Sequence, residues 1–399
     1  MSDPGSVATR LATRARSIAP FHVMRLLARA RALEAAGRPV QHLEIGEPDF
    51  ATPAPVVAAA QRALEAGHTH YTPAAGLPRL REAIAGYYRW RLGLGVDPAR
   101  ILVTPGASGA LQLALLALLD PGDRVLIADP SYPCYRQVAR LAGGEPLAVP
   151  VGPESGYRLT RDSAERAWVP GVRALLVASP SNPTGAVLSG EDLAGLHDLC
   201  RERGAALIVD EIYQGLVYGV EGLSALTLGE AGLFVVNSCS KYFGMTGWRV
   251  GWVVAPRDAV DTLERIAQNL FIAAGTLAQH AACAAFDPAT HAILEGRRQI
   301  FEQRRDLLLA GVRDLGFGVE AEPQGAFYLY AGLPERVRMD SMTYASRLLD
   351  EAGVAVTPGA DFGDHGAERH LRFAYTRDAV EIAAALDRIS AWHRGLGTG

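Results

Sequence analysis

The sequence predicts an α/β protein in which a mostly parallel, seven-stranded sheet carries helices on both faces and a smaller α+β domain is attached. Three observations support this fold class. The chain has 399 residues, 49% of them apolar and 21% charged, which is enough for a large core and more than one domain. From about residue 100 to 255, strand-length apolar runs alternate with amphipathic helical patterns, as is typical of buried parallel strands. After about residue 257 this alternation stops.

Seven apolar runs are the predicted strands of the large sheet. Amphipathic patterns such as Ala110–Leu119 and Gly190–Arg203 fall between most of them, and these helices should cover the two faces of the sheet. In chain order the predicted strands are Ile101–Thr104, Val125–Asp129, Leu147–Val151, Ala174–Ser179, Ala206–Asp210, Phe234–Ser238 and Val250–Ala255.

The segment after the last of these strands has a different organisation. Two helical stretches lead into a long helix rich in arginine and glutamate, and short strands and further helices follow. We expect an N-terminal arm with part of the small domain at residues 1–52, the large domain at 53–290 and the small C-terminal domain at 291–399. The expected elements are helices Ala259–Leu270, Thr276–Phe286, His291–Leu315, Met342–Glu351 and Asp378–His393 and strands Ala326–Tyr330 and His370–Tyr375.

Charge and hydropathy argue against several classes of protein. The formal net charge is −4, so we expect no nucleic-acid or membrane partner. No apolar run approaches the ~18 residues of a membrane span. Residues 1–20 lack the apolar core of a secretory signal, and a frayed arm or short helix is a better interpretation than a mitochondrial presequence. The four cysteines form no CxxC pair and are expected to be reduced thiols of a cytoplasmic protein: Cys134, Cys200, Cys239 and Cys283.

The histidines give no sign of a metal site. His68 and His70 flank a threonine, a spacing that could suggest two ligands. Neither a carboxylate nor a cysteine cluster lies nearby to complete such a site. A solvated turn is therefore the preferred interpretation, and we expect no metal.

Polar side chains follow several predicted strands at the point where each strand ends. In an open α/β sheet, ligands bind beyond the carboxyl ends of the strands, so these side chains should converge on one crevice. The first group is Gly106, Ala107 and Ser108, which lies at the start of a helix. Backbone N–H groups and the helix dipole favour an anion there, although an ordinary helix cap has the same composition.

Four more residues follow the next strands. Tyr132 could stack on a planar ligand or pack in the core, and Asn182 presents an amide or simply forms a turn. Asp210 ends an apolar strand, where a carboxylate is costly unless it has a partner. A protonated ring nitrogen would be such a partner, and so would one of the many arginines. Tyr213 follows three residues later.

Lys241 is the only lysine in the chain. The sequence has 39 lysines and arginines in all, and every other one is an arginine. Lys241 lies three residues after Ser238 and eight before Arg249, both of which suit phosphate oxygens. Unlike a guanidinium, an amine can lose a proton and form an imine with an aldehyde. This pattern indicates a phosphorylated aldehyde cofactor such as pyridoxal 5′-phosphate, whereas the alternative is a chance exposed lysine.

Taken together, these residues lie in motifs that resemble those of the fold-type-I, class I/II aminotransferases over nearly the whole chain. Each motif is modest alone, and the set is specific. The matching stretches are LEIGEPDF (43–50), YTPAAGLPRLREAI (71–84), TPGASGALQ (104–112), DPSYPCY (129–135), SPSNPTG (179–185), VDEIY (209–213), SCSKYFGMTGWRVGW (238–252) and LRFAYT (371–376).

The resemblance implies a role for each matching residue. Lys241 would form the imine with pyridoxal phosphate and move protons, Asp210 would pair with the pyridinium nitrogen, and Tyr132 would stack on the ring. Tyr213 and Asn182 would bind the phenolic oxygen of the ring. The expected phosphate ligands are Gly106, Ala107, Ser108, Ser238 and Arg249, with Tyr71 reaching the phosphate of a neighbouring subunit in a homodimer. The expected ligands of the substrate carboxylate are Arg372, the Gly46 backbone and Asn182.

The implied activity is transamination between an L-amino acid and a 2-oxo acid by a ping-pong mechanism. Alanine or aspartate with 2-oxoglutarate is the expected pair, and Phe21 and Val23 either line the substrate pocket or belong to the core. Two alternatives stay open. The same residues serve a C–S β-lyase or another carbanion chemistry, and a non-catalytic aminotransferase-like regulator is the other possibility. Such regulators carry an added DNA-binding domain, for which the segment before the first α/β unit has no recognition-helix pattern.

Overall fold

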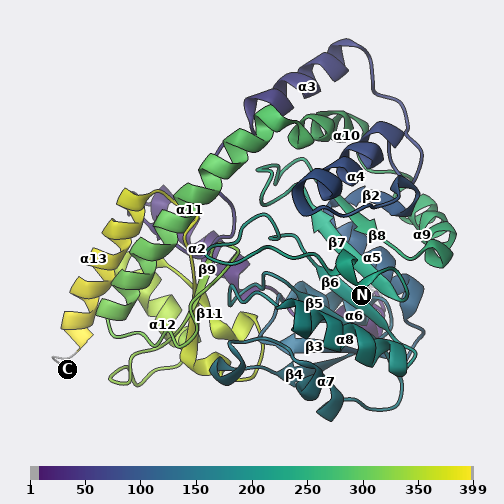
Figure 1. Ribbon diagram of the computed structural model, residues 1–399. Helices are drawn as coiled ribbons and strands as arrows, with labels where there is room; N and C mark the ends of the chain where they lie inside the picture. Colours follow the sequence, from purple (N-terminus) through teal and green to yellow (C-terminus); the bar gives the residue numbers. More distant parts are fainter. Residues whose placement is uncertain (1–8, 397–399) are drawn as a thin grey trace, which may run out of the picture.

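The computed structural model describes residues 9–396 and contains a seven-stranded sheet (Figure 1). The strand order is β2-β8-β7-β6-β5-β3-β4. Every neighbouring pair is parallel except the two that involve β8, which is antiparallel to β2 and β7. The predicted mostly parallel sheet is thereby confirmed. Its strands are β2 (Ile101–Pro105), β3 (Arg124–Asp129), β4 (Glu145–Pro150), β5 (Val172–Ala178), β6 (Ala206–Asp210), β7 (Leu233–Ser238) and β8 (Val250–Val254).

Both faces of this sheet are covered, because successive side chains of a strand point to opposite faces. Val125 and Ile127 of β3 pack in one apolar cluster, and Leu126 between them packs in the other. The first cluster includes residues of α5 (Gly106–Leu118), α6 (Cys134–Leu141) and α9 (Arg257–Leu270). The second includes residues of α4 (Pro78–Leu92), α7 (Arg161–Arg166), α8 (Gly190–Glu202) and α10 (Thr276–Cys283), and α3 (Ala54–Glu65) packs on α10.

A second group of elements lies beside the large sheet, around α11, α12 and α13 (Figure 1). Its antiparallel sheet has the order β11-β12-β9, and a parallel pair joins β1 near the N-terminus to β10. The proposed division of the chain at residues 52 and 290 stays a prediction. The elements are α1 (Thr13–Arg16), α2 (His22–Ala35), β1 (Gln41–His42), α11 (Pro288–Asp314), β9 (Tyr328–Gly332), α12 (Ser341–Arg347), β10 (Val354–Ala355), β11 (Thr357–Pro358), β12 (His370–Ala374) and α13 (Ala379–Leu396).

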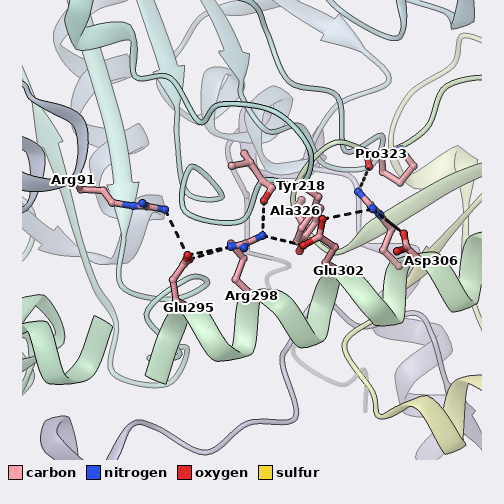
Figure 2. Close-up of polar contacts among 10 residues, drawn as sticks. Arg91, Tyr218, Glu295, Arg298, Glu302, Asp306, Pro323 and Ala326 are labelled. Atoms are coloured by element: carbon pink, nitrogen blue, oxygen red, sulfur yellow. Dashed lines mark hydrogen bonds and ion pairs between the residues drawn. The ribbon is translucent and has the colours of Figure 1, made fainter. Parts of the chain in front are cut away.

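The long helix α11 runs from the region of α10 to the second group of elements, and one of its faces carries a ladder of alternating charges (Figure 2). Glu295 lies 3.8 Å from Arg91 of α4 and 3.0 Å from Arg298. Arg298 also forms an ion pair with Glu302 at 3.2 Å and donates a hydrogen bond to the Val217 carbonyl at 3.1 Å. Spacings of three and four residues put these side chains on one helix face, so the ladder connects α4 and the segment after β6 to α11.

Two expected element boundaries near the site differ from the structure. The helix expected from Ala110 begins at Gly106, so the small residues form its first turn instead of preceding it. The expected strand Ala326–Tyr330 is displaced to Tyr328–Gly332. Ala326 has φ 61, in the left-handed region, and its N–H bonds to the Leu216 carbonyl, so it cannot begin a strand that pairs with β12.

Candidate active site

The strand-end residues do converge. The parallel strands β3, β5, β6 and β7 end at one edge of the sheet, and β2 runs in the same direction because both it and β7 are antiparallel to β8. The antiparallel strand β8 begins at this same edge, directly after Arg249. The edge therefore collects groups that are far apart in sequence, and it is the edge where α/β sheets bind ligands.

The expected phosphate ligands lie around the start of α5. Gly106 has φ 73, and a Cβ there would lie 2.5 Å from the Arg249 guanidinium, so this close approach requires glycine. Ala107 is buried and Ser108 is exposed on the first helical turn. Arg249 itself has φ 56, an uncommon backbone conformation for a side chain of this size. A guanidinium and the amino end of a helix thus face one place, which is the arrangement that binds phosphate.

Ser238 is engaged by the loop that follows it. Its hydroxyl lies 2.9 Å from the Val250 carbonyl and 2.9 Å from the Ser240 hydroxyl, and it accepts from the Ser240 N–H at 3.0 Å. Ser238 is fully buried. These bonds fix the turn that leads from β7 to Lys241.

Asp210 is a buried carboxylate that forms no ion pair with any residue in the described part of the chain. It accepts hydrogen bonds from the Tyr135 hydroxyl at 2.7 Å and from the Ile212 N–H at 3.1 Å. Burial raises the pKa of Asp210 to about 6, while the positive charge of Lys241 acts in the opposite direction. The arginine partner that the sequence left open is therefore not present, and the carboxylate remains available to an external cation.

The Lys241 amine is partly buried and donates to the Gly46 carbonyl at 2.7 Å. It lies 5.7 Å from the centre of the Phe327 ring. A Cβ on Gly46 would collide with the Tyr328 hydroxyl, so position 46 requires glycine to leave room for Tyr328. The lone lysine and the loop expected to bind a substrate carboxylate are thus in direct contact.

Arg372 of β12 is buried and meets the expected carboxylate-binding residues. Its Nη1 donates to Asn182 Oδ1 at 2.9 Å, and its Nη2 donates to the Glu44 carbonyl at 2.5 Å. Its guanidinium lies between the rings of Tyr328, at 4.2 Å, and Phe362, at 4.9 Å. Its Nε is buried without a hydrogen-bond partner, which leaves one donor for a ligand.

Three residues of this site were not selected from the sequence. Tyr135 holds Asp210, Tyr328 bonds through its hydroxyl to Tyr213 at 3.0 Å, and Phe362 covers Arg372. Tyr135 stands in the matching stretch DPSYPCY, and Tyr328 stands in the run FYLY at residues 327–330. Buried aromatic residues in such runs contribute mainly to the core. Only their contacts separate them from the rest of the core.

The remaining expected residues lie at the edges of the site. Tyr132 packs edge-to-face on Tyr135, with ring centres 5.4 Å apart, and Phe21 lies 6.3 Å from Tyr132. Tyr71 does not join the site of its own chain, since 84% of its surface is exposed on the loop before α4.

His68, one of the two histidines considered as metal ligands, lies outside these residues. It stacks on His280 with ring centres 4.3 Å apart.

Known proteins resemble this chain over most of its length. A family model described as aminotransferase class I and II matches residues 38–389. The chain is 39% identical over 387 residues to a valine–pyruvate aminotransferase of Mycobacterium tuberculosis, covering 96% of this chain and 98% of that protein. It is 38% identical over 382 residues to an aspartate/prephenate aminotransferase of Thermus thermophilus, covering 95% and 98%.

A solved structure gives the same answer. An aminotransferase from Mycobacterium tuberculosis superposes with a TM-score of 0.93 at 37% identity, and the match covers 97% of this chain and 100% of that one. The fold is that of an enzyme that transfers amino groups. The chain belongs to the class I and II aminotransferases. None of the helices between residues 9 and 396 is both long and apolar enough to cross a bilayer.

Proposed function

We propose that this aminotransferase uses pyridoxal 5′-phosphate, held covalently by Lys241, to exchange an amino group between an L-amino acid and a 2-oxo acid. The observation that supports this cofactor most directly is the environment of Asp210. A fully buried carboxylate with hydrogen bonds but no cationic partner is costly unless a positive charge is brought by a ligand. A protonated pyridine nitrogen supplies that charge.

The other groups fit the remaining parts of the same cofactor. Gly106, Ala107, Ser108 and Arg249 suit the phosphate, because they combine a helix start with a guanidinium. Ser238 either contributes its hydroxyl to the phosphate or holds the loop in the way described above.

The groups on the ring side are complementary as well. Tyr213 and Asn182 lie on the side of Arg372 and suit the phenolic oxygen of the ring. Tyr132 provides an aromatic face beside Tyr135, the residue that holds Asp210.

The cofactor, when bound, supplies an aldehyde that captures the amino group and a ring that accepts electrons from the substrate. Arg372 orients the substrate by binding its α-carboxylate, with Asn182 and the Gly46 backbone beside it. With the cofactor bound, Lys241 would be the general base for the proton on the substrate Cα. Asp210 would hold the ring nitrogen in its protonated form.

The substrates are proposed at a coarser level. Alanine or aspartate with 2-oxoglutarate remains the expected pair, and the relatives extend the amino donors worth testing to valine. All of these share the α-carboxylate that Arg372 is placed to bind, so the site geometry favours an amino acid without choosing its side chain.

We also propose a cytoplasmic homodimer with shared active sites. Tyr71 is a large aromatic residue held outward on its loop, and the Thr276 hydroxyl donates to the neighbouring His70 carbonyl at 2.7 Å. Such a residue is suited to reach the phosphate of a second subunit. The four cysteines are free, as is usual in a reducing compartment. A Tyr71→Phe variant should bind the cofactor more weakly while remaining dimeric in sedimentation.

Two measurements test the proposal. Reduction of the purified enzyme with borohydride, followed by peptide mass mapping, should place a pyridoxyl adduct on Lys241, and an unmodified Lys241 peptide would contradict it. A panel of amino donors and oxo acceptors, followed by the absorbance of the cofactor, should then identify the substrates.

Two further assays test the alternatives. Release of pyruvate and ammonia from cystathionine without transamination would favour a lyase, and a gel-shift assay that detects bound DNA would favour a regulator.

A further inference from the structure

The segment that precedes α2 lies between the two groups of elements at the side of the active site. Phe21 faces the ring of Tyr132 at 6.3 Å, and the Ala19 N–H lies 3.4 Å from the Gln137 side-chain oxygen. The short helix α1 packs against α6, which in turn packs on strands β3 and β4 of the large sheet. The segment is therefore in contact with the residue expected to stack on the cofactor ring.

A carboxylate from the group of elements around α11, α12 and α13 binds the end of this segment. Asp361 accepts from the His22 N–H through Oδ1 at 2.7 Å and from the Val23 N–H through Oδ2 at 2.8 Å. The first N–H groups of a helix have no partner within the helix and carry a partial positive charge. The residue at the N-cap position of α2, Phe21, provides no side-chain cap. Asp361 caps α2 from 339 residues away in the sequence, and it is 93% buried, with 7% exposure.

The next residue links the same place to the substrate arginine. The Phe362 ring lies 4.9 Å from the Arg372 guanidinium, and the Phe362 carbonyl accepts from the Ser131 N–H at 2.9 Å. Ser131 directly precedes Tyr132. Two consecutive residues therefore contact the start of α2, Arg372 and the strand end that carries Tyr132.

We propose that Asp361 is a positioning residue for transamination. By capping α2 it fixes Phe21 beside Tyr132 while Phe362 stays on Arg372, so the wall beside the ring and the carboxylate-binding group keep one relative position. This inference rests on the proposed role of Arg372 as the ligand of the substrate carboxylate. Asp361 touches neither cofactor nor substrate in this assignment and acts through Phe21 and Phe362.

The test compares Asp361→Ala and Asp361→Asn with Asp364→Asn in the cofactor-loaded enzyme. Asp364 is an exposed carboxylate three residues away, which makes it the matched control. Loss of a helix cap corresponds to a change of about 3- to 30-fold in an equilibrium. The Asp361→Ala variant should lose about that factor in kcat/KM for L-alanine, L-valine or L-aspartate, whichever the enzyme accepts. The loss should fall mainly on KM, and the cofactor absorbance should not change.

A second measurement looks directly at the contact. Hydrogen–deuterium exchange of the peptide that contains residues 18–24 should be faster in Asp361→Ala than in the native enzyme, and intermediate in Asp361→Asn, which keeps one acceptor oxygen. Should Asp361→Ala fail to fold, Asp361→Asn carries both measurements. Unchanged kcat/KM with unchanged exchange, or an equal loss in Asp364→Asn, overturns the proposal.

The failure of the underlying assignment has a different signature. If Arg372 does not bind the substrate carboxylate, Arg372→Gln leaves KM for the amino acid unchanged. In that case Asp361→Ala still accelerates exchange at residues 18–24 without an effect on KM, and only the functional link is lost.

Discussion

Charged side chains are arranged in opposite ways on α11 and in the active site. On α11, each member of the ladder finds an opposite charge: Glu295 has Arg91 and Arg298, and Glu302 has Arg298 and Arg305 (Figure 2). Their side chains are partly exposed, between 17% and 33%. Such pairs stabilise a surface modestly and need nothing from outside the chain.

In the active site, the charges have hydrogen bonds but no opposite charge within the described residues. This holds for Asp210, Lys241, Arg249 and Arg372. Asp210 and Arg372 are buried, whereas Lys241 is partly buried and Arg249 is exposed. Since a buried charge without a partner lowers stability, Asp210 and Arg372 are best explained by partners that arrive with the ligands. The comparison teaches that unpaired charges mark chemistry and paired charges mark structure, and the following predictions test that distinction in order of decreasing effect.

Removing the amine should have the largest effect. Lys241→Ala should reduce the rate of transamination by at least about 10³-fold, because both the covalent attachment and the general base are lost. Steady-state rates with the best donor pair measure this. Without cofactor, the thermal midpoint of the variant should stay close to that of the native protein, since the amine has no structural ion pair to lose. Turnover at the native rate would remove the basis of the proposed function.

The next largest effect should come from the carboxylate that we propose as the partner of the ring nitrogen. Asp210→Asn should lower kcat by about 10²- to 10³-fold, the factor that corresponds to breaking a buried pair by removing one partner. The control is Glu211→Gln, next in the chain. Burial raises the pKa of Glu211 to about 8, so this carboxyl is mostly neutral at pH 7 and the exchange should change kcat little. Equal losses in both variants would contradict the special role of Asp210.

The same carboxylate should make the cofactor-free protein sensitive to pH. The pKa of Asp210 rises from 3.8 to about 6 on folding because of burial. A raised carboxyl pKa favours the folded state below about pH 4, and this contribution, on the order of 3 kcal/mol, is lost as the pH rises through 6. Thermal unfolding of cofactor-free native protein and Asp210→Asn between pH 4 and 7.5 should show a decline that the variant lacks. If the thermal midpoints of the native protein and of Asp210→Asn changed with pH in the same way, the assignment of this pH dependence to Asp210 would be wrong.

A smaller effect is expected at Arg372, the arginine that we propose as the ligand of the substrate carboxylate. Arg372→Lys should raise KM for the amino donor by roughly 10²-fold, because an ammonium cannot bind a carboxylate through two donors or lie flat between Tyr328 and Phe362. Arg369→Lys is the control, because its guanidinium bonds to the Val337 and Met339 carbonyls. That variant should affect stability more than KM. A normal KM in Arg372→Lys would move the substrate site elsewhere.

The smallest effect should come from the ladder. Arg298→Gln should lower the free energy of unfolding by about 0–1 kcal/mol and leave kcat and KM unchanged. In 1 M salt the difference between variant and native protein should shrink further, because salt screens ion pairs that water partly reaches. Denaturant titrations at two salt concentrations measure this. A large loss of activity would show that paired charges on α11 also serve the reaction, and it would erase the distinction between the two regions.

The fold could be predicted largely from the sequence because its signals are local. The apolar runs that end at Asp210 and Ser238 are strands at nearly the predicted positions, since a run of buried residues between turn signals specifies a strand without reference to the rest of the chain. The displaced strand at Ala326 shows the limit. Its pattern is apolar, but a contact with Leu216 more than a hundred residues away holds Ala326 in a left-handed conformation.

What the sequence alone determined was the chemistry available: one amine in a chain of arginines, placed after a strand and flanked by groups that suit phosphate. Tertiary structure alone decided the pairings. It left Asp210 without an arginine, put Tyr328 and Phe362 on Arg372, and brought Asp361 to the start of α2. The physical reason is range. Periodicity and turn chemistry act over a few residues, whereas a contact across hundreds of residues depends on how the sheets and helices pack.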